Sequence, residues 1–235
     1  MDDKDPHGLP SPEEQIEAIR AMLSAGHRAI RLDPHTFGLW GMATTACILG
    51  ERAIFTASRF PRHWQLATFQ ILYIALCIAS TVALDLRITK RVRRKRDESY
   101  PFIQRQIGKC TLLLGGLGLV VGFGGWYHAW YTVVFIFWIA DIGVVLFIHG
   151  LFSEQFLGWA GLSLIALAVA AVAFGVPFEG TRFLLLATCG LGLPSLGFML
   201  RPLGRWGTGA RLACLSGWVA AISSAAYVGF WMSQT

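Results

Sequence analysis

The stretch WYTVVFIFWIADIGVVLFIH, residues 130 to 149, decides the fold of this 235-residue chain. Before His149 at its end, it carries one charged residue, Asp141, among mainly aliphatic and aromatic side chains. A helix of about 20 apolar residues rises about 30 Å, which is the thickness of the hydrocarbon core of a bilayer. The stretch therefore predicts a helix that crosses a membrane.

Further apolar runs of similar length lie on both sides of this stretch. Over the whole chain 54% of the residues are hydrophobic and 14% are charged, whereas about 25% are charged in soluble domains. The sequence therefore predicts an all-α, polytopic transmembrane helix bundle over residues 37–231, which follows an N-terminal segment, residues 1–36. We expect about seven spans, near residues 37–56, 65–86, 110–127, 130–149, 157–176, 181–200 and 211–231.

The distribution of Lys and Arg predicts how these spans are oriented. If the N-terminus is cytoplasmic, sixteen of the 20 basic residues fall on the inner side. The other four, on the outer side, are Arg52, Arg59, Arg62 and Arg182. Basic residues concentrate in cytoplasmic loops. We therefore expect a multi-pass protein of a bacterial inner membrane with the N-terminus cytoplasmic and the C-terminus outside.

The basic residues are densest in the predicted cytoplasmic connector, residues 87–109. Four of them are consecutive, Arg93, Arg94, Lys95 and Arg96. Each base near an anionic bilayer surface contributes about 1 kcal/mol to binding, so this cluster is a candidate site for anionic lipids. The alternative is that it only fixes the topology. Because the bases lie beside apolar spans, we expect no nucleic-acid partner.

The N-terminal segment contains an amphipathic pattern, SPEEQIEAIRAMLSAGHRAIRL, residues 11–32. Ser11 and Glu14 have the spacing of a helix-capping box. The apolar residues Ile16, Ile19 and Leu23 then fall on one face of the predicted helix. Such a helix lies on the membrane surface or packs under the bundle, docks on a partner protein, or joins two copies of the chain.

The third predicted span contains a stripe of four glycines, Gly115, Gly118, Gly122 and Gly125. Gly118 and Gly122 form a GxxxG pair, so we expect another helix of the chain, or a second copy of it, to approach closely here. In the sixth span Pro194 stands between glycines and predicts a kink. A kinked helix can line a cavity, so Pro194 and the neighbouring Ser195 join Asp141 in a hypothetical ligand or proton site.

Asp141 is the main candidate functional residue, because a carboxylate at the centre of a bilayer costs about 3 kcal/mol and marks a functional site by default. No Lys or Arg lies at matching depth in another predicted span. We therefore expect Asp141 to be neutral at pH 7. It then either donates a hydrogen bond to a nearby hydroxyl or backbone carbonyl, or serves as a proton, cation or ligand site.

Grouped catalytic or metal-binding residues are not found in the sequence. His128 and His149 fall at opposite ends of the bilayer, and the five cysteines have no CxxC spacing. We expect no cofactor, no metal site and no catalytic residue, and so no enzyme. The last predicted span also lacks the lysine that holds retinal in rhodopsins.

Two stretches carry a resemblance, WIADIGVVLFIHGLFSEQFLGWAGL at residues 138–162 and VPFEGTRFLLLATCGLGLPSLGF at residues 176–198. With the N-terminal helix, their order resembles a group of small multi-pass inner-membrane proteins of bacteria over about residues 12–200. Members of that group often accompany small cytoplasmic transcriptional regulators, so the resemblance implies a sensing or regulatory role. The seventh predicted span departs from the six-span pattern of the group.

Two functions are therefore expected from the sequence. The first is a non-enzymatic sensor, regulatory partner or accessory subunit that binds a protein partner or a second copy of itself. The second is a small transporter, or a component of a proton or cation pathway, that uses Asp141.

Overall fold

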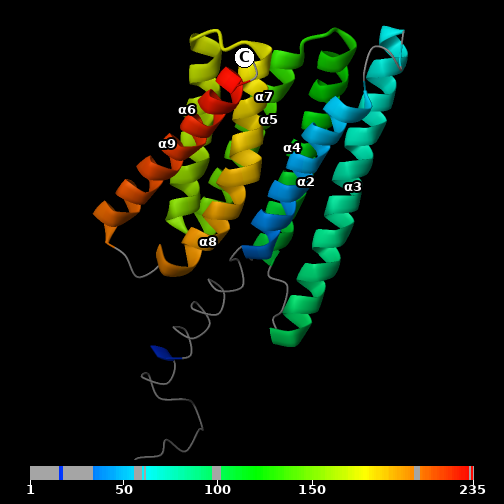
Figure 1. The fold of residues 1–235 in the computed structure, drawn as a ribbon. Coiled ribbons are helices and arrows are strands. Elements are labelled where there is room, and N and C mark those ends of the chain that lie inside the picture. The colour runs from blue at the N-terminus through cyan, green and yellow to red at the C-terminus, as the bar shows by residue number, and fades with distance from the viewer. Residues whose placement is uncertain are drawn as a thin grey trace, which may run out of the picture.

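The structure, a computed structural model, describes residues 16–17, 34–55, 60, 62–96, 102–203, 207–232 and 234. Over these residues the chain is an all-α bundle, as the sequence predicts, and no strand occurs in the part described (Figure 1). The helices run up and down in a single bundle. They are α2 (Pro34–Ile54), α3 (His63–Arg96), α4 (Phe102–Tyr127), α5 (Tyr131–Phe152), α6 (Gln155–Ala173), α7 (Phe178–Ala187), the π-helical η1 (Thr188–Gly192), α8 (Leu193–Leu203) and α9 (Thr208–Met232).

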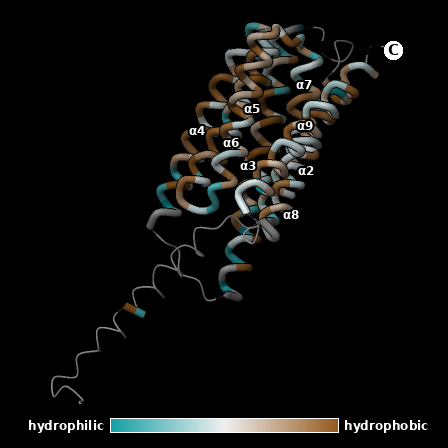
Figure 2. Tube along the Cα trace, turned by 90° about the vertical axis from the view of Figure 1, so that its left-hand side faces the viewer, coloured by the Kyte–Doolittle hydropathy of each residue, from teal (hydrophilic) through white to brown (hydrophobic). Residues whose placement is uncertain are grey.

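Six of the long helical segments in the described part are long and apolar enough to cross a membrane. They are α3, α4, α5, α6, the continuous segment α7–η1–α8, and α9. Much of their length consists of hydrophobic residues, as the brown segments of the tube show (Figure 2). The protein is therefore a multi-pass membrane protein. The seventh long helix, α2, has the length of a span but carries His35, Glu51 and Arg52, which lower its hydropathy.

The basic connector is helical over most of its length. The second span was expected to end near residue 86, but α3 continues to Arg96. The third span was expected to begin at Cys110, but α4 begins at Phe102. Residues 87–96 and 102–109 are thus extensions of two membrane helices. A helix carries polar residues as readily as apolar ones, so hydropathy marks the edge of the membrane and not the end of the helix.

The closest helix packing is between α5 and α6, which form a hairpin. A Cβ atom added to Gly143 of α5 would lie 2.8 Å from the carbonyl oxygen of Gly161 in α6. Nearer the turn, Gly150 of α5 meets the backbone of Gly158 in the same way. Small residues allow two membrane helices to approach until their backbones touch, and this contact stabilises them where no hydrophobic driving force exists. The α5–α6 hairpin is therefore a tightly packed helix pair, whereas the most buried span in the described part is the segment α7–η1–α8.

The sixth span is interrupted by the five-residue π-helix η1, which directly precedes α8. Pro194 lies one residue inside α8, and it has no backbone N–H to donate to the preceding turn. The backbone N–H of Leu193 instead bonds the carbonyl of Thr188 five residues earlier. The expected kink is thus a π-bulge, which is the usual form of a local change of register within a helix.

Candidate functional site

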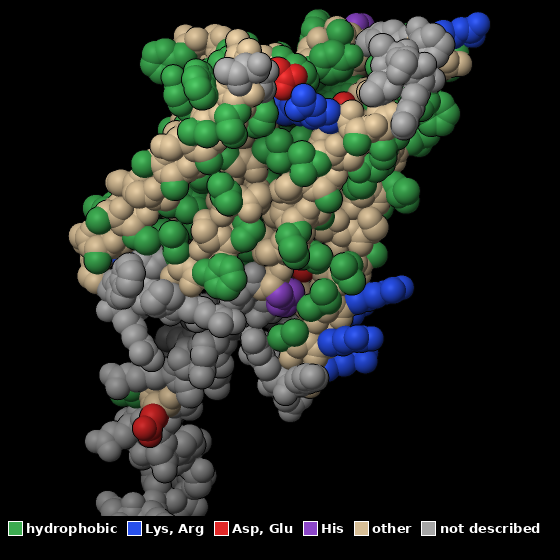
Figure 3. All heavy atoms as spheres, in the orientation of Figure 1, with side chains coloured by type: hydrophobic (Ala, Val, Ile, Leu, Met, Phe, Trp, Pro, Cys, Tyr) green, Lys and Arg blue, Asp and Glu red, His purple; other side chains and the backbone are tan. Residues whose placement is uncertain are grey.

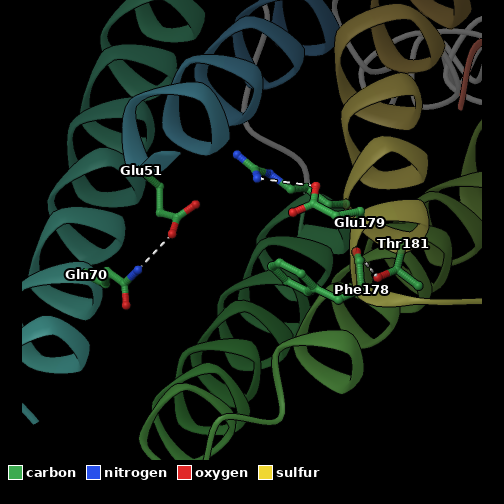
Figure 4. A network of polar contacts seen from close by, with 6 residues as sticks. Glu51, Gln70, Phe178, Glu179 and Thr181 are labelled. Atoms are coloured by element: carbon green, nitrogen blue, oxygen red, sulfur yellow. Dashed lines mark hydrogen bonds and ion pairs between the residues drawn. The ribbon is translucent and has the colours of Figure 1, made fainter. Parts of the chain in front are cut away.

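A cluster of polar side chains, in which Gln70, Thr181 and Arg182 are buried and Glu51 and Glu179 are partly exposed, lies between α2, α3 and α7 at the end of the bundle where α2 ends and α7 begins. We call this end, uppermost in Figure 1, the upper end; it is the predicted outer end. Gln70 of α3 is only 5% exposed, and its amide Nε2 donates a 2.7 Å hydrogen bond to Oε1 of Glu51 on α2 (Figure 4). The other amide atom, Oε1 of Gln70, is buried and has no partner in the described part of the chain.

The second half of the cluster is an ion pair within α7. Arg182 is 6% exposed, and its Nη1 lies 3.6 Å from Oε2 of Glu179, one helical turn earlier. This distance is too long for a hydrogen bond, and Oε2 of Glu179 has no hydrogen-bond partner within the described segments. The neighbouring Thr181 is fully buried and donates to the carbonyl of Phe178 at 2.8 Å. The guanidinium of Arg182 is therefore buried with a loosely held counter-ion.

Electrostatic interactions connect the two halves. The Glu51 carboxylate is attracted by Arg182 and repelled by Glu179, and it also acts on Tyr131 at the start of α5. In the space-filling view, red and blue side chains meet near the upper end of a largely uncharged face (Figure 3). Charges in such low-dielectric surroundings interact strongly. A proton or an ion that reaches Glu51 would therefore change its attraction to Arg182, and with it the contact between α2 and α7.

Asp141, the residue singled out from the sequence, lies in the middle of α5. It is 10 residues from the start of the helix at Tyr131, which corresponds to about 15 Å. It is 7% exposed. No hydrogen bond or ion pair of its carboxyl group occurs among the residues that the structure describes. The expected hydroxyl partner is therefore not found there, and Asp141 lies apart from the charge cluster at the upper end.

The other two residues of the hypothetical site, Pro194 and Ser195, lie beside the π-bulge. The hydroxyl of Ser195 donates to the carbonyls of Leu191 and Gly192, at 2.6 and 2.9 Å. The indole N–H of Trp218 on α9 lies 3.0 Å from the Gly192 carbonyl and 3.1 Å from Oγ of Ser195. These contacts satisfy backbone carbonyls next to the proline, which is what a bulge in a membrane requires. They give Ser195 a structural role.

The glycine stripe of α4 faces α5 along most of its length. A Cβ atom added to Gly118 would lie 3.2 Å from the ring of Trp138, and one added to Gly122 would lie 3.9 Å from Nε1 of that residue. Gly125 meets the side chain of Val134. Gly115 has no neighbour within 4 Å of such an atom. The contact is made with tryptophan and valine side chains, so α4 stays further from α5 than α6 does.

The two remaining candidate surfaces lie largely outside the described residues. In the amphipathic segment the structure describes Ile16, which is helical and 52% exposed, whereas Ile19 and Leu23 lie outside. In the basic cluster Arg94 is exposed on the last turn of α3. The side chains of Arg93, Lys95 and Arg96 lie outside the described set. The structure therefore leaves both the docking role and the lipid role as predictions.

No grouping of three or more His, Cys, Asp or Glu side chains that could hold a metal ion occurs in the described part of the chain. No family model, no curated protein and no solved structure matches this sequence. The candidate site must therefore be interpreted from its own geometry. The Glu51–Gln70–Arg182 cluster was not identified from the sequence, because Arg182 was treated there only as one of four basic residues on the outer side. The similar depth of Glu51 and Arg182 in two spans was the available signal.

Proposed function

We propose that the protein is a non-enzymatic membrane sensor or regulatory subunit. In this proposal a change at the partly buried charge cluster of the upper end is passed through α2 to the N-terminal amphipathic helix, which binds a cytoplasmic partner. The observation that carries the proposal is the position of Glu51. It lies near the C-terminal end of α2, and the N-terminal segment directly precedes the same helix in the sequence.

The length of α2 supports this role. Its 21 residues correspond to about 31 Å, which is enough to cross the hydrocarbon core. At its upper end Glu51 contacts Gln70 of α3 and interacts with Arg182 of α7. Near its lower end Thr36 donates to Asp85 of α3 at 3.1 Å. Polar contacts hold both ends of α2, and apolar residues fill the space between them.

A charge cluster with a buried arginine and partly accessible carboxylates is a suitable switch element. Neutralising Glu51, by a proton or by a bound cation, removes its attraction to Arg182. Within the described residues, that guanidinium then keeps Glu179, 3.6 Å away, as its counter-ion. A change of this kind shifts the equilibrium between two arrangements of α2. The free energy of the shift equals the difference between the two arrangements in their interaction energy with the charge. The N-terminal segment directly precedes α2 in the sequence, and in this proposal a shift of α2 is passed to that segment.

The test is purification of the full-length protein from its native membrane with a mild detergent, followed by identification of the proteins that remain bound. A defined partner should be lost on Ile19→Glu and on Leu23→Glu. Ala21→Glu adds the same charge on the opposite face of the predicted helix, and it should leave the partner bound. Glu51→Gln should change the amount of bound partner without touching the docking surface.

The proposal fails if no protein partner is retained, or if Ala21→Glu removes the partner as completely as Ile19→Glu does. It also fails if Glu51→Gln and Arg182→Gln both fold normally and leave partner binding unchanged. In that case the N-terminal helix is a simple anchor and the charge cluster has no part in signalling.

A second function, a proton or cation pathway, is favoured by one separate observation. Asp141 is buried at mid-depth and has no hydrogen-bond partner in the described part of the chain, which is a costly arrangement for a purely structural carboxyl group. Proton flux into liposomes that contain the purified protein alone would support this function, provided that Asp141→Asn abolishes the flux. Absence of flux in the wild-type protein would leave the sensor as the better account.

A further inference from the structure

Two cysteine side chains that are distant in the sequence meet between α2 and α3, which run antiparallel and side by side (Figure 1). The thiol of Cys47 on α2 is hydrogen-bonded to the thiol of Cys77 on α3, and both cysteines are free. The thiol of Cys77 is also hydrogen-bonded to the hydroxyl of Tyr73, one helical turn earlier. Two sulfur atoms at hydrogen-bonding distance need only a small movement to reach the geometry of a disulfide.

The packing of the two helices holds these thiols together. The hydroxyl of Tyr73 also lies where a Cβ atom of Gly50 would be, so α2 and α3 are in close contact one turn above the thiols. Nearer the lower end, Thr36 of α2 donates to Asp85 of α3 at 3.1 Å. The thiol pair lies between these two contacts in both helices. The register of α2 against α3 therefore brings the two sulfur atoms to the same depth.

The thiol pair lies deep in the membrane, at the edge of the contact between the two helices. Cys77 is near the middle of the spanning segment Trp64–Val92. Both cysteines are half-buried, and each directly follows an exposed apolar residue, Ala46 on α2 and Leu76 on α3. The sulfur atoms are therefore within reach of a molecule dissolved in the hydrocarbon core, whereas a charged reagent in water is separated from them by that core.

The depth of the pair favours a neutral product over a bound metal ion. A structural zinc ion takes four ligands, and the described part of the chain contains no group of three His, Cys, Asp or Glu side chains that could hold a metal. Two thiolates can hold a monovalent soft ion such as Cu⁺. That complex carries a net negative charge, which is costly in hydrocarbon. A disulfide is neutral, as the two thiols are.

We propose that Cys47 and Cys77 are an oxidation site, at which a lipid-soluble quinone of the bilayer converts the two thiols to a disulfide that joins α2 to α3. Both S–H bonds break and one S–S bond forms. Two electrons pass to the quinone and two protons end on its oxygen atoms, so the quinone becomes a quinol. The Glu51 carboxylate, one turn from Cys47 on α2, interacts with that thiol and can accept the first proton on its way to the quinone.

The disulfide connects the two helices covalently in the middle of the membrane. It requires only the contact between α2 and α3, so it stands or fails independently of the proposed function. If α2 shifts as in the proposed function, the oxidised protein restricts that shift, because a disulfide allows little change in the distance between the residues that it joins.

The experiment uses the full-length protein in liposomes, which is fully reduced and then freed of reductant without oxygen. The liposomes receive a fully substituted benzoquinone, whose ring offers no free position to which a thiol could add. Free thiols are then alkylated in denaturant and counted by mass spectrometry. Of the five cysteines, all should be alkylated before the quinone is added and three afterwards. One quinone should be consumed per chain, and digestion should yield a peptide pair linked through Cys47 and Cys77.

The variant Cys77→Ser removes one partner, and its four remaining thiols should stay free in the presence of the quinone. The matched control is Cys110→Ser, since Cys110 is exposed on α4 and this variant should still lose two thiols to oxidation. Oxidised glutathione, which is charged and stays in water, should leave the pair largely reduced. The linked peptides are identified in the wild-type protein, so the result does not depend on the folding of a variant.

The proposal is overturned if the quinone leaves all five thiols of the wild-type protein free, or if the linked peptides contain a different pair of cysteines. It is also overturned if oxidised glutathione oxidises the pair as fast as the quinone does. A metal ion that is present in the purified wild-type protein and absent from Cys77→Ser would equally contradict it, because the thiols would then be ligands.

Discussion

The amide of Gln70 donates a 2.7 Å hydrogen bond to the carboxylate of Glu51 and thereby connects α3 to α2 at the upper end of the bundle. Gln70 is almost completely buried, whereas Glu51 is partly accessible. A hydrogen bond to a charged acceptor is stronger than one between neutral groups. This contact therefore holds the upper end of α2 in the position from which Glu51 interacts with Arg182.

Gln70→Leu is predicted to destabilise the protein by about 1 to 3 kcal/mol, because it keeps the apolar volume but leaves Glu51 without its donor. Thermal unfolding in one detergent measures the effect. Thr68→Ala is the control, since Thr68 lies on the same turn of α3, is exposed, and bonds only the carbonyl of Trp64 within its own helix. Equal unfolding temperatures for the two variants would show that the Glu51–Gln70 contact contributes nothing to stability.

The glycines of the α5–α6 hairpin are predicted to be far less tolerant than those of α4. Gly161→Leu should prevent folding, because its side chain would occupy the backbone of α5 near Gly143 and Phe147. Gly118→Leu should destabilise by less, about 1 to 3 kcal/mol, because the ring of Trp138 can shift. Yield and unfolding temperature of the two purified variants give the comparison. A Gly161→Leu protein as stable as the Gly118→Leu protein would contradict the close backbone contact of α5 with α6.

Much of the fold was predictable from the sequence, because a hydrophobic run of about 20 residues has few alternatives to a spanning helix. The break near Pro194 was predictable for the same kind of reason, since proline removes a backbone donor in any helix. The length of α3 beyond residue 86 was not, because lysine and arginine are good helix formers and hide the helix end from a hydropathy argument.

The candidate site was harder to predict, because it depends on which spans are neighbours. Glu51 and Arg182 are separated by more than a hundred residues, and only the arrangement of α2 and α7 makes them interact. The close contact of Gly143 with Gly161 also required the α5–α6 hairpin. The more conspicuous stripe of α4 faces bulkier residues. A row of glycines shows where a helix can approach and does not show which side chains fill the space.

Two replacements of Asp141, by Leu and by Asn, are predicted to separate a structural role from a functional one. Asp141 has no hydrogen-bond partner in the described part of the chain, so Asp141→Leu leaves no polar group unsatisfied there and should not lower stability. Asp141→Asn keeps the shape and removes titration. If Asp141 carries a proton or a cation, both variants should be stable and inactive in the liposome flux assay. If the free energy of unfolding of the Leu variant is lower by about 1 kcal/mol or more, Asp141 has a polar partner outside the described residues. On this scale roughly 1.4 kcal/mol corresponds to a tenfold change in the unfolding equilibrium.

Trp218 is predicted to contribute more to stability than any hydroxyl next to the π-bulge. It is 3% exposed, and its N–H lies 3.0 Å from the Gly192 carbonyl and 3.1 Å from Oγ of Ser195, which joins α9 to the irregular part of the sixth span. Trp218→Phe removes that donor and should cost about 0.6 to 2 kcal/mol, the range for interhelical hydrogen bonds in membranes. Ser195→Ala should cost less, because Ser195 donates only to carbonyls of its own helical segment and the Gly192 carbonyl keeps the Trp218 bond.

Thermal unfolding of Trp218→Phe, Ser195→Ala and the double variant measures both effects and their coupling. Trp159→Phe on α6 is the control, since Trp159 is 47% exposed and should tolerate the loss of its indole N–H. If Trp218→Phe is no less stable than Trp159→Phe, the Gly192 carbonyl is satisfied in another way, and the bulge does not depend on α9. If the double variant loses more than the sum of the single ones, the indole and the hydroxyl compensate for each other at the same carbonyl.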